Sequence, residues 1–168
     1  MRSNVVVIAM FLLLSCVYPR TVGETSHGIP VTTETVPYHT QEEISEVVEA
    51  MILATSLYVG INDPLYLEGS IRRQISYYPS RIHVEPKTFR CGKTFCSGLF
   101  DPRDNSIRFV DNPCLAYSSL AHEVAHMIQW LAGYYIDHKH DDARFWGSDG
   151  IVQEVNAALR VKRCQKIQ

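Results

Sequence analysis

The chain has 168 residues, of which 46% are hydrophobic and 20% are charged, and its formal net charge is -2. This length suits one domain with a modest core, and this composition excludes an intrinsically disordered chain or a bundle of membrane helices. A nearly neutral chain also lacks the positive field that binding to nucleic acid requires. We therefore expect one globular domain that acts as a monomer and has no nucleic-acid partner.

Residues 1–16 have the pattern of a signal peptide. Arg2 precedes the apolar run Val5–Leu14, which is too short to span a bilayer. The run ends in Leu-Leu-Ser-Cys at Cys16, which resembles a bacterial lipoprotein box whose lipidated cysteine would tether the protein to a membrane. The alternative is an ordinary signal-peptidase site nearer Gly23. Both interpretations predict an exported protein that is secreted, periplasmic or lipid-anchored at the cell surface.

Export would place the remaining cysteines in an oxidising compartment, where thiols pair. These cysteines are Cys91, Cys96, Cys114 and Cys164, and they permit three pairings among which the sequence does not choose. The spacing of Cys91 and Cys96 is compatible with half of a zinc knuckle, but no second close pair follows. We therefore expect structural disulfides.

The next segment, residues 17–39, contains proline, glycine, serine and threonine without an apolar period, which predicts a linker. The folded domain is expected over residues 40–168. Capping signals and apolar spacing predict its helices, and short apolar runs between turn residues predict its strands. The helices are expected over Thr40–Gly60, after Asp63, over Leu115–Leu131 and from Ser148 to about Val161, and the strands over Ile82–Val84, Ser97–Phe100 and Ile107–Val110. This order indicates an α+β fold with a small antiparallel sheet.

The motif His122-Glu123-Val124-Ala125-His126 falls inside the third of these helices. Histidines four residues apart project from one helix face, so both imidazoles can reach one zinc ion at about 2.0 to 2.1 Å. Glu123 can then act as a general base, because zinc lowers the pKa of a coordinated water to about 7. The motif therefore predicts a zinc-dependent metalloprotease.

A catalytic zinc site needs a third protein ligand and an open fourth position. The polar residues downstream of the motif include several that could serve. These candidates are Asp137, His138, His140, Asp141, Asp142 and Glu154.

The stretch from His122 to Gly133, followed by His140 and the pair Phe145-Trp146, resembles the SprT-like (Spartan-type) zinc metalloprotease domain. In that family the third ligand is a histidine beyond the loop that follows the metal helix, and His140 fits its spacing. The resemblance implies a zincin-like fold, in which the sheet packs with the metal helix and two to three further helices. It also implies Zn²⁺ held by His122, His126 and His140, and a protein or peptide substrate.

The chain departs from the family pattern in three ways. Asp141 replaces the glycine expected after the third ligand, the aromatic pair comes late, and no zinc ribbon or DNA-binding extension follows. The last departure and the expected export both argue against the DNA–protein crosslink repair of intracellular members. The fold and the zinc chemistry are therefore what we expect to be shared.

Two alternatives remain open. Glu154, in Glu-Val-Asn-Ala-Ala, lies where gluzincin-type peptidases take a glutamate from a later helix as the third ligand. In the second alternative the protein is an exported zinc-binding protein without catalytic turnover.

Overall fold

The computed structural model of the chain describes residues 19–60, 63–78, 80–114, 118–133 and 138–163. The predicted signal peptide and the predicted lipoprotein box at Cys16 lie outside these residues. Among the described segments, no helix is long and apolar enough to cross a membrane. The elements in chain order are β1 (Arg20–Glu24), β2 (Pro30–Thr33), α1 (Gln41–Val59), α2 (Pro64–Tyr77), β3 (Arg81–Glu85), β4 (Phe89–Cys91), β5 (Thr94–Cys96), β6 (Gly98–Asp101), β7 (Ser106–Val110), α3 (Leu120–Leu131), α4 (Ala143–Trp146) and α5 (Ile151–Arg163).

The first two helices begin where their capping residues predict. Thr40 and Glu43 form a complete capping box at the start of α1, which ends at Gly60. Asp63 caps α2, because its carboxylate accepts a hydrogen bond from the Tyr66 N–H at 3.0 Å. Pro64 then occupies the first turn, where its missing N–H leaves no helical hydrogen bond unmade.

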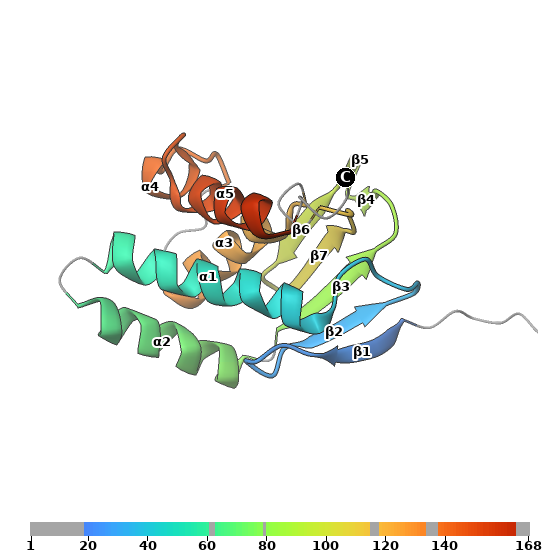
Figure 1. Ribbon diagram of the computed structural model, residues 1–168, viewed down its shortest axis with the longest axis horizontal. Coiled ribbons are helices and arrows are strands. Elements are labelled where there is room, and N and C mark those ends of the chain that lie inside the picture. The colour runs from blue at the N-terminus through green and yellow to red at the C-terminus, as the bar shows by residue number, and fades with distance from the viewer. Residues whose placement is uncertain (1–18, 61–62, 79, 115–117, 134–137, 164–168) are drawn as a thin grey trace, which may run out of the picture.

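The main sheet is mixed, so the prediction of an antiparallel sheet is wrong. Its strand order is β1-β2-β3-β7-β6, and the pairs β2–β3 and β3–β7 are parallel (Figure 1). Helices α1 and α2 lie between β2 and β3 in the chain, and a crossover of this kind returns the chain in the same direction. The pairs β1–β2 and β6–β7 are antiparallel. Strand β6 is the last in the order and therefore lies at an edge of the sheet.

The linker prediction for residues 17–39 is also wrong where β1 and β2 form. Ile29, Val31 and Thr33 alternate along the chain and are almost fully buried. Such alternation is typical of a strand with one face on the core, but three residues amid turn-forming neighbours are too few to show it in the sequence. The β1–β2 hairpin forms the edge of the main sheet opposite β6.

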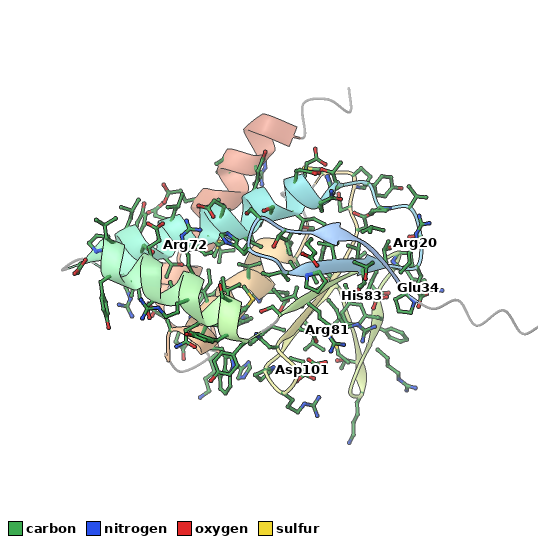
Figure 2. The ribbon with its side chains drawn as sticks, turned by 90° about the horizontal axis from the view of Figure 1, so that it is seen from below. Arg20, Glu34, Arg72, Arg81, His83 and Asp101 are labelled. Carbon is green, nitrogen blue, oxygen red and sulfur yellow. A yellow bond between two sulfur atoms is a disulfide. The ribbon has the colours of Figure 1, made fainter. Side chains whose placement is uncertain are left out.

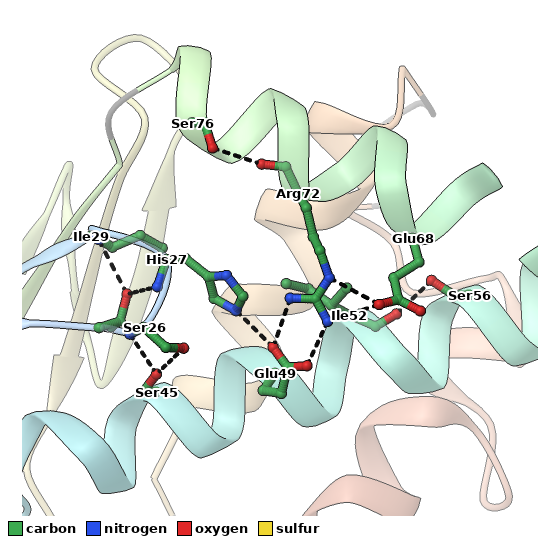
Figure 3. Close-up of polar contacts among 11 residues, drawn as sticks. Ser26, His27, Ile29, Ser45, Glu49, Ile52, Ser56, Glu68, Arg72 and Ser76 are labelled. Carbon is green, nitrogen blue, oxygen red and sulfur yellow. Dashed lines mark hydrogen bonds and ion pairs between the residues drawn. The ribbon is translucent and has the colours of Figure 1, made fainter. Parts of the chain in front are cut away.

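The β1–β2 hairpin is joined to the helices by a charged network (Figure 3). Glu49 of α1 accepts hydrogen bonds from His27 at 2.8 Å and from both terminal nitrogens of Arg72, at 2.9 and 2.5 Å. Arg72, on α2, also bonds to Glu68. Because the three elements meet at one carboxylate, the network fixes the hairpin and α2 relative to α1.

The remaining strands, β4 and β5, form a separate hairpin closed by the disulfide Cys91–Cys96. Cys114 is disulfide-bonded as well, and Cys164 lies outside the described residues. The prediction of structural disulfides is confirmed for the first pair, and it agrees with an oxidising compartment.

One face of the main sheet is apolar and packs against the helices. Its buried side chains on β3 and β7 are Ile82, Val84, Ile107 and Phe109, which join residues of α1, α3 and α5 in one core. The opposite face of β3 carries Arg81 and His83 (Figure 2). The sheet therefore holds α3 from one side only, and α3 carries the predicted metal motif.

Candidate metal centre

Helix α3 places the motif at the boundary between core and surface. His126 and Glu123 are buried, and His122 is half-buried. The helix is apolar around most of its circumference, so the motif's polar groups are held in place by packing on both sides. It ends before Gly133, whose φ of +74° is a backbone conformation that glycine adopts without strain.

The third predicted ligand, His140, meets the two histidines of α3. The available ligand atoms of His122, His126 and His140 all lie within 4.8 Å of one another, and the Nε2 atoms of His126 and His140 are 3.3 Å apart. Two nitrogens bound tetrahedrally to one metal at 2.0 to 2.1 Å would be separated by about 3.3 Å. The three-histidine group can therefore bind a metal ion.

His140 reaches the site through an unusual backbone conformation. Its φ is +60°, a left-handed conformation that disfavours side chains with a Cβ by roughly 1 to 2 kcal/mol. The next helix, α4, begins directly afterwards, where the Asp142 carboxylate accepts the N–H of Arg144. Strain of this kind persists where the surrounding structure imposes it, and it is concentrated at functional sites.

The charge state of the histidines also suits a metal. Burial, together with the neighbouring His140, lowers the pKa of His122 to about 4. Burial and the neighbouring His122 lower the pKa of His126 to about 4 as well. Both imidazoles are therefore neutral at pH 7, which is the form that binds metal ions.

Trp146 of α4 covers the three histidines. Its ring centroid lies 4.7 Å from that of His122, 4.8 Å from that of His126 and 4.4 Å from that of His140. The indole is therefore a common wall for all three imidazoles and keeps water from one side of the group. The sequence predicted an aromatic pair near the site but gave no indication of this contact.

Glu123 lies beside the histidines, and its carboxyl lies against the edge strand β6. Burial raises the pKa of its carboxyl to about 7, and a hydrogen bond from the Phe100 N–H partly opposes that rise. A Cβ on Gly98 would overlap Glu123 Oε1 and Ser119 Oγ. The absence of a side chain at Gly98 therefore makes room for the carboxylate against the edge of β6.

The other candidate ligands lie elsewhere. Glu154 is exposed on α5 and hydrogen-bonds to Tyr58 of α1, whose pKa it raises. The exposed His138 has its ring centroid 5.9 Å from that of His126 and is not part of the group. Asp142 caps α4 and pairs with Arg144, while Asp137 lies outside the described residues. Among the described residues, the geometry thus favours His140 over Glu154.

A cleft of about 630 Å³ opens beside His122 and Glu123. One wall comes from β5 and β6, including Phe95 and Gly98, and the other from α5, including Val152 and Asn156. Ser119 lies between the walls, and its hydroxyl donates to the Ser97 carbonyl at 2.7 Å. The candidate base and one histidine are therefore accessible to a ligand in the cleft.

No protein-family model matches the chain, and neither a curated protein nor a solved structure shows significant similarity to it. The site's geometry therefore carries the functional argument.

Proposed function

We propose that the protein is an exported zinc-dependent peptidase of SprT-like type, in which His122, His126 and His140 hold Zn²⁺ and Glu123 is the general base. The observation that carries the proposal is the meeting of three histidines, one buried glutamate and one open cleft. This combination provides a ligand set, a proton acceptor and space for a substrate at one place.

Zinc is the metal that best suits the donor set. Three imidazoles with a free fourth position are a known catalytic zinc environment, and the neutral histidines need lose no proton to bind it. When bound, zinc would polarise a peptide carbonyl and acidify water. A purely structural site would fill the fourth position with another protein ligand. Among the described residues, no fourth member joins the group.

Glu123 suits the role of general base. Its buried carboxylate directly follows the ligand His122 in the chain, and both residues line the cleft. Its carboxylate would take a proton from the attacking water and return it to the leaving amine. The hydrogen bond from the Phe100 N–H would hold the carboxylate in one orientation throughout.

The edge strand β6 supports a peptide as substrate. The Val110 N–H donates to the Ser97 carbonyl at 2.8 Å, and Gly98 lies opposite Phe109. In an antiparallel strand, every second residue directs its main-chain N–H and C=O groups toward the partner strand. Since Ser97 bonds to β7, Gly98 and Phe100 do not share that direction: their main-chain groups point away from β7. Glu123 engages Phe100, and we expect the main-chain groups of Gly98, which lines the cleft, to pair with an extended peptide there.

The proposal is tested with Glu123→Gln, and Glu154→Gln serves as the control. Both variants should bind one zinc ion per chain, and mass spectrometry of the metal measures this zinc content. Glu123→Gln should lower hydrolysis of casein and of a quenched fluorescent peptide library by about a hundredfold to ten-thousandfold, whereas Glu154→Gln should keep wild-type activity.

Two results would contradict the proposal. Equal turnover by Glu123→Gln and the wild type would exclude Glu123 as the base. Stoichiometric zinc without cleavage of any library peptide by the wild type would favour the non-catalytic zinc-binding protein.

A further inference from the structure

We infer that Asn156 binds the substrate main chain, with its carboxamide oxygen accepting a hydrogen bond from a peptide N–H in the cleft. This inference rests on the proposed function, because it assumes that a peptide occupies the cleft beside Glu123. It adds a specific binding residue on the wall opposite β6.

The position of Asn156 suits this role. It lies on α5, one turn after Val152, and both residues line the cleft together with His122 and Glu123. An extended peptide paired with Gly98 on one side would direct every second residue's main-chain groups toward the opposite wall. Asn156 is an uncharged hydrogen-bonding residue on that wall, half-buried rather than free in solvent.

The hydrogen bonding of Asn156 is incomplete in the described structure. Its Oδ1 is buried and has no hydrogen-bond partner. A buried acceptor without a partner destabilises the fold, so most such atoms in folded proteins are paired. A ligand in the cleft that Asn156 lines would provide the missing donor once the carboxamide turns toward it.

The carboxamide can turn toward such a ligand. The terminal torsion of asparagine has broad, shallow minima, so a small rotation changes the direction of Oδ1 without moving α5. Asn156 can therefore meet a peptide N–H without rearrangement of the helix.

The test separates binding in the cleft from binding to the metal. Acetohydroxamate chelates zinc without filling the cleft, whereas N-acetyl trialanine hydroxamate carries a peptide into it. In zinc-loaded protein, Asn156→Ala should weaken binding of the trialanine compound by about tenfold and leave acetohydroxamate affinity within about twofold. Gln74→Ala, which removes a carboxamide from α2 outside the cleft, should change neither affinity.

A second variant excludes a structural role. Replacing an unpaired polar group by an apolar one of similar shape is neutral or stabilising, so Asn156→Leu should unfold at the wild-type temperature or above it while losing trialanine affinity. A large drop in its unfolding temperature would show that Asn156 supports the fold and would overturn the inference.

The remaining outcomes are distinguishable. If acetohydroxamate binds and Asn156→Ala retains full affinity for the trialanine compound, the inference is wrong and the zinc site stands. If acetohydroxamate fails to bind zinc-loaded wild type, the proposed zinc site fails and the inference fails with it.

Discussion

Two clusters in this molecule combine glutamate with histidine, and their environments are opposite. In the first, Glu49 lies between Arg72 and His27, and the hydrogen bond from Arg72 holds the pKa of Glu49 below its usual value (Figure 3). In the second, Glu123 lies beside His122, where burial raises its pKa to about 7. The anionic form of glutamate is thus favoured on α1, whereas burial on α3 raises the pKa of the carboxyl in the metal-free protein.

The difference separates a structural cluster from the proposed metal site. In the Glu49 cluster each charge meets an opposite charge, and the result is attachment of the hairpin to α1 and α2. At the metal centre burial opposes charge on Glu123 and on the two helical histidines. Buried titratable groups of the second kind are characteristic of sites where protons or metals are exchanged.

The largest effect is expected when a histidine of the proposed metal site is removed, and the histidine of the Glu49 cluster provides the control. His126→Ala should weaken zinc binding by roughly a hundredfold to a thousandfold, because one ligand contributes a large part of a total near 10 to 16 kcal/mol. His27→Ala should leave zinc affinity unchanged. Competition with a fluorescent zinc chelator measures both, and equal affinities of the two variants would remove the functional distinction between the clusters.

In metal-free protein, the buried carboxyl of Glu123 should make the free energy of unfolding depend on pH. Because the pKa of Glu123 is raised from 4.5 to about 7, its protonated form favours folding below pH 4.5, and this contribution is lost as the pH rises through 7. Glu123→Gln removes that dependence. Relative to wild type, its free energy of unfolding in urea should therefore increase by about 3 kcal/mol between pH 4 and pH 8. A constant difference across this range would contradict the burial argument.

Gly98→Ala tests whether the edge of β6 positions the base. The new Cβ would displace the Glu123 carboxylate and the Ser119 hydroxyl, and a displacement near 1 Å can reduce a rate by about a hundredfold. Peptide hydrolysis should fall by that order while zinc content stays at one per chain. Gly69→Ala is a suitable control, because a Cβ on that exposed helical glycine meets nothing within 4 Å. Equal activity of both variants would show that Glu123 does not depend on Gly98.

The smallest effect is expected in the partnered cluster. Glu49→Gln should destabilise the protein at pH 7 by about 0.5 to 1 kcal/mol, since the pair is partly exposed to solvent. The pKa of Glu49 is lowered, so its contribution is present above pH 4.5 and is lost as the pH falls through the folded-state value. Urea unfolding should show the difference shrinking toward acidic pH, opposite in direction to Glu123→Gln.

The sequence predicted those features that local chemistry decides. The capping residues Thr40 and Asp63 located the starts of α1 and α2, and the motif located both helical histidines. The structure also places His140 beside His122 and His126, as the sequence predicted. These features depend on neighbours within a few turns of the chain or on one specific motif.

Features that depend on distant contacts were not predicted. Strand β2 is recognisable by its parallel pairing with β3, about 50 residues later, rather than by its own short sequence. Trp146 contacts the three histidines from a separate helix, α4, and the left-handed backbone of His140 follows no local sequence signal. Gly98 and Asn156 acquire their roles from residues on other elements, so their own sequence neighbourhoods carry no signal.

In the proposed metal site the third ligand is His140 and not Glu154. The most direct test is the zinc content of His140→Ala and Glu154→Ala, measured side by side after equilibration with one molar equivalent of zinc and gel filtration. The structure predicts that His140→Ala loses most of its zinc and that Glu154→Ala retains one ion per chain. Stoichiometric zinc in His140→Ala together with loss in Glu154→Ala would contradict this assignment and identify Glu154 as the third ligand.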